Sequence, residues 1–140
     1  MSKGTVLIVD DDVDILDLVQ EALEEEGYAV AVSRDSTALR HVHEQQVDLI
    51  LLDLTVMRGE GRATVEWLRA DPATAHIPLI GFSTRNDGVL LAAQMRLDDL
   101  LPKPFDLDHL VALVRQWIAE GRRWRDTAAP GWGYAPAASQ

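Results

Sequence analysis

The sequence predicts an α/β fold in which helices cover both faces of a parallel, doubly wound sheet of five strands. Short apolar segments alternate with segments of helical spacing, which is typical of consecutive β-α units. Three of the apolar segments are continuously apolar, as strands buried on both faces are. Pro102 lies at the end of the fifth segment, and proline suits an edge strand because it cannot donate to a ladder. Together these observations favour a flavodoxin-like (βα)5 arrangement with strand order 2-1-3-4-5.

The elements follow one another at short intervals along the chain. The predicted strands are Val6–Val9, Tyr28–Val32, Leu49–Leu52, Ile77–Phe82 and Leu100–Leu101. Apolar residues recur with helical spacing between them, first at Ile15, Val19, Ala22 and Leu23, and last at Leu107, Leu110, Val111, Val114, Trp117 and Ile118. Gly27 is expected to end the first helix, and Asp71-Pro72 the third.

The chain divides into a domain over residues 1–120 and a tail over residues 121–140. The tail is rich in Gly, Ala and Pro and has no periodicity, so it is too short and too irregular for a second domain. It also carries Trp124, Trp132 and Tyr134, and exposed tryptophan often marks contact sites. We therefore interpret the tail as either mobile or a docking segment.

Composition and charge exclude several classes of function. There is no cysteine, which excludes disulfides, thiol chemistry and cysteine-based zinc sites. Residues 1–120 contain 10 Lys/Arg and 22 Asp/Glu, a net charge of −12, which disfavours direct binding to nucleic acid. No apolar segment is long enough to cross a bilayer, and the N-terminus does not resemble a secretory signal. We expect a cytoplasmic protein that does not bind membranes.

Polar residues follow four of the five predicted strands directly. They are Asp10, Asp11 and Asp12 after the first strand, Asp53 after the third, Ser83 and Thr84 after the fourth, and Lys103 after the fifth. In an open parallel sheet, ligands bind at the carboxyl ends of the strands, where the strand order reverses. We therefore expect these side chains to meet at one edge of the sheet.

Three carboxylates in one cleft need a neutralising partner, because they cannot all stay ionised unaided. Mg²⁺ suits such a site, since it binds one or two carboxylates together with waters and a phosphate. Lys103 adds a second positive charge and Ser83 adds a hydroxyl group. This set of groups is typical of phosphoryl transfer, with Asp53 as the nucleophile that forms an aspartyl phosphate.

The four stretches VLIVDDDVDI, VDLILLDL, IPLIGFST and LPKPF resemble, in this order, the motifs of the receiver domain of response regulators. The resemblance covers residues 4–119. It implies that Asp53 accepts a phosphoryl group from a histidine kinase or a histidine phosphotransfer protein. It also implies that Mg²⁺ is held by Asp10, Asp11, Asp53 and the backbone carbonyl of Thr55.

The resemblance implies further roles at the other strand ends. Ser83 would bond a phosphoryl oxygen and Lys103 would pair with the phosphate, with the Lys103–Pro104 peptide bond expected in the cis form. Thr84 stands where the family usually has alanine, and we expect it to shield the phosphate and slow its hydrolysis. Two further positions depart from the family pattern: Met57 replaces the usual proline and Leu100 the usual aromatic residue.

The resemblance favours a stand-alone receiver domain that signals by protein contact. It would not be an enzyme in the ordinary sense, although it would assist its own phosphorylation and dephosphorylation. A dimer could form through the surface of the fourth helix, fifth strand and last helix, or through the tail.

Two other functions are weighed against this one. A degenerate receiver would bind partners without phosphorylation. A small Mg²⁺-dependent phosphatase with an aspartate nucleophile would need a second acid two residues after Asp53, where the chain has Thr55.

Several polar residues have a purely structural interpretation. Asp12 and Asp14 are expected mainly to cap the first helix. His41 and His43 are expected to lie on the surface of the second helix and not to bind metal.

Overall fold

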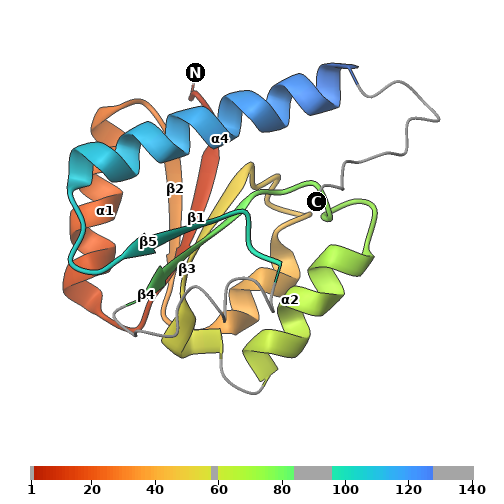
Figure 1. Cartoon of the computed structure of the whole chain (residues 1–140), viewed down its shortest axis with the longest axis horizontal. Helices are drawn as coiled ribbons and strands as arrows, with labels where there is room; N and C mark the ends of the chain where they lie inside the picture. Colours follow the sequence, from red (N-terminus) through yellow and green to blue (C-terminus); the bar gives the residue numbers. More distant parts are fainter. Residues whose placement is uncertain (1, 58–59, 84–95, 128–140) are drawn as a thin grey trace.

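The five predicted strands form one parallel sheet. The computed structural model describes residues 2–57, 60–83 and 96–127. The strands are β1 (Thr5–Val9), β2 (Ala29–Ser33), β3 (Leu49–Asp53), β4 (Leu79–Ser83) and β5 (Asp99–Pro102). They lie in the order β2-β1-β3-β4-β5, and every pair is parallel (Figure 1). This confirms the predicted fold class and places Pro102 on an edge strand.

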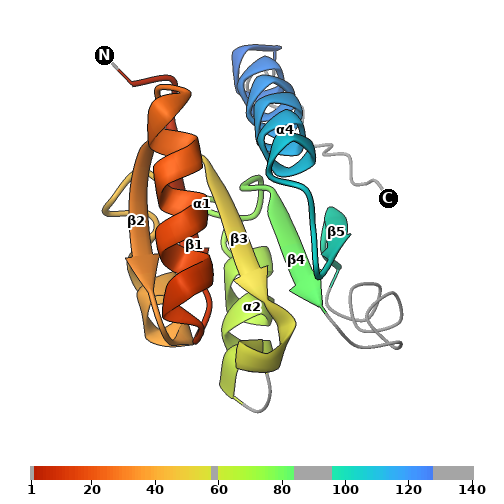
Figure 2. The same cartoon turned by 90° about the vertical axis from the view of Figure 1, so that its left-hand side faces the viewer.

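Two layers of helix cover the sheet. On one face lie α1 (Val13–Glu25) and α4 (Leu107–Thr127), and on the other lie the 3₁₀-helix η1 (Ser36–His41) and α2 (Glu60–Ala70), as Figure 2 shows. Because successive side chains of a strand point to opposite faces, each central strand contributes side chains to two apolar cores, one on each face of the sheet. In β1, Val6 and Ile8 face the α1–α4 side, whereas Leu7 and Val9 face the η1–α2 side.

The ends of the first helix match the sequence prediction. The side chain of Asp12 accepts hydrogen bonds from the backbone N–H groups of Asp14 (2.9 Å) and Ile15 (3.4 Å), so Asp12 is the N-cap. Gly27 has a positive φ of 100°, and the N–H groups of Gly27 and Tyr28 bond back to carbonyls of the last helical turn. This pattern is a Schellman motif, in which glycine is favoured because it lacks a Cβ.

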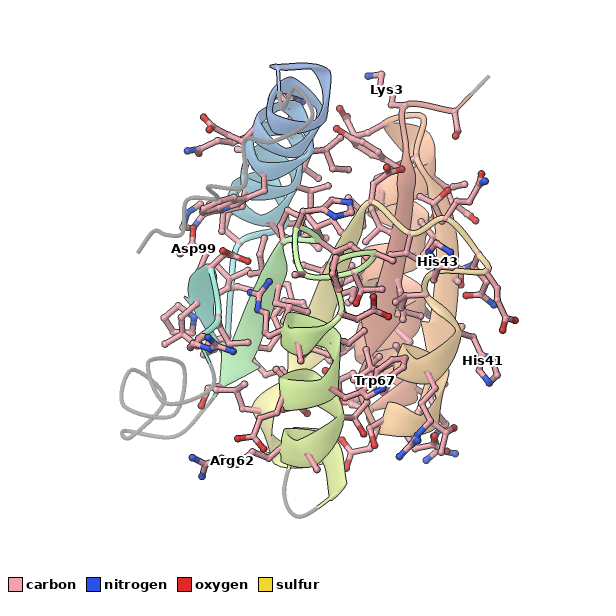
Figure 3. All side chains as sticks on the ribbon, turned by 90° about the vertical axis from the view of Figure 1, so that its right-hand side faces the viewer. Lys3, His41, His43, Arg62, Trp67 and Asp99 are labelled. Carbon is pink, nitrogen blue, oxygen red and sulfur yellow. The ribbon has the colours of Figure 1, made fainter. Side chains whose placement is uncertain are left out.

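The second helical segment differs from the prediction. We expected an α-helix bearing His41 and His43, but the structure has the short 3₁₀-helix η1, and His43 lies in the turn beyond it. Serine, threonine, histidine and valine in this segment favour an α-helix only weakly, which accounts for the short element. Both histidines are exposed and point outward, as expected (Figure 3).

The last helix extends beyond the predicted domain boundary. It continues past residue 120 to Thr127, so the start of the predicted tail is helical. The tail residues 128–140 lie outside the described part of the chain. Among the described helices, none has the length and apolar character required to cross a bilayer.

Arg69 of α2 fixes the edge of the sheet. Its guanidinium donates to Asp98 Oδ2 at 2.8 Å, to the Arg96 carbonyl at 2.8 Å, and to the carbonyls of Ala75 and Ile77 at 3.0 and 3.1 Å. The side chain is nearly buried. These bonds join the end of α2 to the segments that lead into β4 and β5, and they use the forked geometry that only arginine offers.

Candidate functional site

The side chains of three predicted site residues lie on the same face of the sheet, at its carboxyl edge. Asp10 continues the alternation of Val6 and Ile8 beyond β1, and its backbone N–H bonds to the Ser33 carbonyl at 3.1 Å. Asp53 ends β3. Lys103 follows β5, and its N–H bonds to the Ser83 carbonyl at 2.8 Å. Because strand residues alternate, all three side chains lie toward the α1–α4 layer. The arrow tips in Figure 2 mark the carboxyl ends of the strands.

The Lys103 ammonium group bridges the two aspartates. Its Nζ donates to Asp10 Oδ2 at 2.8 Å and to Asp53 Oδ2 at 3.3 Å. Asp10 is fully buried, Asp53 is 4% exposed, and the Lys103 side chain is 15% exposed. Buried charges are costly unless they are paired. The pairing therefore explains how two carboxylates are tolerated at the ends of two apolar strands.

Backbone N–H groups hold the remaining oxygens of the two carboxylates. Asp10 Oδ1 accepts from the Asp12 N–H at 2.9 Å, and Asp53 Oδ1 accepts from the Thr55 N–H at 3.1 Å. Both donors lie two residues after their acceptor, in the Asx-turn pattern. Each side chain is thus oriented by its own loop as well as by Lys103.

The electrostatics of the site follow from burial and pairing. Burial raises the pKa of Asp10 above its ordinary value of 3.8, against the lowering effect of the hydrogen bond from Lys103. Burial also acts to lower the pKa of Lys103, but the Asp10 hydrogen bond and the charges of Asp53 and Asp10 outweigh it. The pKa of Lys103 therefore lies above its ordinary value of 10.5.

The acidic residues suit a hard divalent cation. Carboxylate oxygens of Asp10, Asp11 and Asp53 lie within 4.8 Å of one another, with Asp11 exposed at the rim. Oxygen donors of this kind fit Mg²⁺, which keeps several of its waters. The predicted carbonyl ligand Thr55 belongs to the 3₁₀-helix η2 (Leu54–Met57) directly after β3, and its role as a ligand stays a prediction.

Of the two predicted hydroxyl residues, one lies within the described part of the chain. Ser83 ends β4 and is buried. Thr84 lies outside the described residues. The Lys103–Pro104 bond is cis, as predicted. Leu100, which stands where the family usually has an aromatic residue, is half-buried and packs against the apolar core on the α2 side.

Sequence reasoning missed one neighbour of the site, Phe82. In the β3–β4 register Phe82 lies directly beside Asp53 and faces the same side of the sheet. The Lys103 Nζ lies over its ring, 5.8 Å from the centroid, and the ring stacks on Phe105 at 5.0 Å between centroids. The sequence near Phe82 does not identify it as a neighbour of Asp53, because that position depends on the register between β3 and β4.

Comparisons with known proteins identify the family of this chain. The family model described as "response regulator receiver domain" matches residues 6–115. The chain is 36% identical over 110 residues to the transcriptional regulatory protein CpxR of Escherichia coli, covering 79% of this chain and 47% of CpxR. It is 36% identical over 116 residues to the DNA-binding response regulator MtrA of Mycobacterium tuberculosis, covering 81% of this chain and 50% of MtrA. The chain thus spans about half the length of these curated relatives.

Solved structures show the same fold. The receiver domain of the Francisella response regulator 1452 matches with a TM-score of 0.73 and 26% identity, covering 84% of this chain and 98% of that one. The signal receiver domain of a LuxO repressor protein from Vibrio parahaemolyticus matches with a TM-score of 0.77 and 19% identity, covering 90% and 98%. The fold and the family model agree, and the chain belongs to the family of response regulator receiver domains.

Proposed function

We propose that this receiver domain accepts a phosphoryl group on Asp53 in a Mg²⁺-dependent transfer from a phosphohistidine. The observation that carries the proposal is the placement of one ammonium group between two buried carboxylates, at 2.8 and 3.3 Å from Lys103. Such a site acts by positioning and by neutralising charge, which is what phosphoryl transfer requires.

The transfer uses Asp53 as the nucleophile. One of its carboxylate oxygens attacks phosphorus and forms the new P–O bond, while the P–N bond to the donor histidine breaks. The electron pair of that bond stays on the imidazole nitrogen, which takes up a proton. Lys103, already within 3.3 Å of Asp53, offsets the negative charge that gathers on the phosphoryl oxygens.

Asp10, Asp11 and Asp53 would hold the Mg²⁺, with Thr55 as a further ligand through its carbonyl. When bound, the ion supplies positive charge to the phosphoryl oxygens. The loops that orient Asp10 and Asp53 through the N–H groups of Asp12 and Thr55 keep the carboxylates in place before the donor arrives.

Two hydroxyl residues complete the proposal. Ser83 is placed at the end of β4, beside the strand that carries Asp53, where its hydroxyl would bond a phosphoryl oxygen. Thr84 is expected to shield the acyl phosphate from water. Replacing Thr84 with alanine should therefore speed dephosphorylation of the purified phosphoprotein, and an unchanged rate would remove Thr84 from the mechanism.

The donor is expected to be a histidine kinase or a histidine phosphotransfer protein, and the output a protein contact. The relatives named above are transcriptional and DNA-binding regulators, whereas residues 1–120 of this chain carry a net charge of −12. Phosphate backbones repel such a surface. A dimer through the surface of the predicted fourth helix, β5 and α4, or through the tail, would be one form of that contact. The predicted fourth helix of this surface lies outside the described residues.

Phosphorylation by a small donor tests the proposal without a cognate kinase. Purified protein is incubated with acetyl phosphate and Mg²⁺, and its intact mass is measured. The wild type should gain one phosphoryl group, while Asp53→Ala and the isosteric Asp53→Asn should gain none. Asp17→Asn, which removes an exposed acid on α1, is the matched control and should label like the wild type. A wild type that gains no phosphate would favour the phosphorylation-independent binding module.

A further inference from the structure

Phe82 supplies a surface against which the Lys103 ammonium lies. Its ring is fully buried, and Lys103 Nζ lies over it at 5.8 Å from the centroid. A cation within about 6 Å of a ring centroid is attracted by the negative face of the ring. The contact therefore has the geometry of a cation–π interaction, inside the site and next to Asp53 in the sheet register.

Phe105 fixes the orientation of that ring. The two rings lie 5.0 Å apart between centroids, at an interplanar angle of 19°. Phe105 follows Lys103 by two residues and is partly buried against the same core. The segment after β5 thus contains both Lys103 and the phenylalanine ring that packs against Phe82.

We infer that Phe82, braced by Phe105, is a positioning residue that holds the Lys103 ammonium in line for the phosphoryl group. The inference rests on the proposed phosphorylation of Asp53. The Lys103 side chain is a flexible four-carbon stem that ends in three donors. The ammonium group donates two hydrogen bonds, one to Asp10 and one to Asp53. When a phosphoryl oxygen replaces one of these carboxylates as the hydrogen-bond acceptor, the fixed ring face limits the positions that Nζ can adopt.

The chain contains a built-in control for this contact. Lys3 and Lys103 are its only lysines. Lys3 Nζ lies over the ring of Tyr28 at 6.0 Å from the centroid, at the start of the chain and away from the strand ends that carry the site. Lysine-selective NMR therefore gives two sets of side-chain signals, one for the site and one for a ring contact outside it.

The first measurement is this NMR spectrum without Mg²⁺ or phosphate. The ε-methylene signals of Lys103 should be shifted upfield by the ring current of Phe82 and should lose that shift in Phe82→Leu. Lys3 should not change. In Tyr28→Leu the pattern should reverse, with Lys3 moving and Lys103 unchanged.

The second measurement separates ring charge from ring shape. Phe82 is replaced by phenylalanine carrying one, two or three ring fluorines, which deplete the negative ring face with little change in size. The initial rate of phosphate uptake from acetyl phosphate should fall stepwise, to about one fifth in the trifluoro variant, a loss typical of one cation–π contact. Tyr28→Leu should label like the wild type.

The outcomes are distinct. A trifluoro variant that labels at the wild-type rate and keeps the Lys103 shift would overturn the inference, even if Phe82→Leu does not fold. If the wild type takes up no phosphate, the proposed function fails, and the Lys103 shift alone decides whether Phe82 positions the ammonium. A shift that does not depend on Phe82 would then overturn the inference as well.

Discussion

Replacing Lys103 with methionine should destabilise the metal-free protein, because it leaves two buried carboxylates without their cation. Methionine keeps most of the apolar stem and removes the charge. At an effective dielectric constant of about 20, unit charges at the observed 2.8 and 3.3 Å attract by about 6 and about 5 kcal/mol. Desolvation of the ammonium offsets much of this, and removing one partner of a buried pair typically costs about 3–5 kcal/mol. We expect a loss of about 3 kcal/mol, since Lys103 is 15% exposed.

Urea denaturation at neutral pH without Mg²⁺ measures this loss. The midpoint should fall with an unchanged slope, which means that stability changed and not the compactness of either state. A double variant that also carries Asp10→Asn should recover much of the loss, because it removes the carboxylate that contacts Lys103 at 2.8 Å. The variant should also lose less at acidic pH, where a buried carboxyl can take up a proton.

Two results would refute this reasoning. One is a loss below about 1 kcal/mol at neutral pH, which is the size expected of an exposed pair. The other is an equal loss in the presence and absence of Asp10→Asn, because the cost would then not come from the unpaired carboxylate. Either outcome would mean that Lys103 is not the cation on which the burial of Asp10 and Asp53 depends.

Three further predictions follow from particular contacts. The raised pKa of Asp10 means that the folded state binds this proton more tightly than the unfolded state does. The free energy of unfolding of the metal-free wild type should therefore rise, relative to that of Asp10→Asn, as the pH falls through the raised pKa toward 3.8. Denaturation of both proteins across this pH range measures the difference. Arg69→Lys should cost about 2 kcal/mol in urea denaturation because lysine cannot reach all the acceptors of the fork, whereas Arg115→Lys, at an exposed pair, should cost less than about 0.5 kcal/mol. Gly81→Ala should lower the thermal midpoint and reduce the free energy of unfolding by about 1–3 kcal/mol, because the added Cβ would lie 2.8 Å from Leu97 Cδ1. An unchanged midpoint would show that the neighbouring side chains can move to accommodate the Cβ without loss of stability.

Much of the site could be predicted from the sequence because parallel sheets place strand ends together. Once the apolar segments were recognised as strands, Asp10, Asp53 and Lys103 had to lie at one edge. Alternation along each strand then put their side chains on one face. The same local logic identified Asp12 and Gly27 as the ends of the first helix, since capping depends on residues within one turn.

Other features depended on contacts that local patterns do not encode. The second helical segment is a 3₁₀-helix, and the last helix continues to Thr127, because the extent of a helix reflects packing as well as composition. The guanidinium of Arg69 joins positions far apart in the sequence, and the residues around position 69 do not indicate which groups accept its hydrogen bonds.

The sequence by itself determined the fold class, the strand order and the carboxyl-edge cluster of acids and amine, because each follows from short-range periodicity and from the geometry of parallel strands. Only the tertiary structure decided that one ammonium bridges two buried carboxylates, and that the Phe82 ring lies beneath it. Those facts depend on how four strands from distant parts of the chain are registered against one another. Distances of a few ångströms between such side chains are set by packing, which no local pattern of residues specifies.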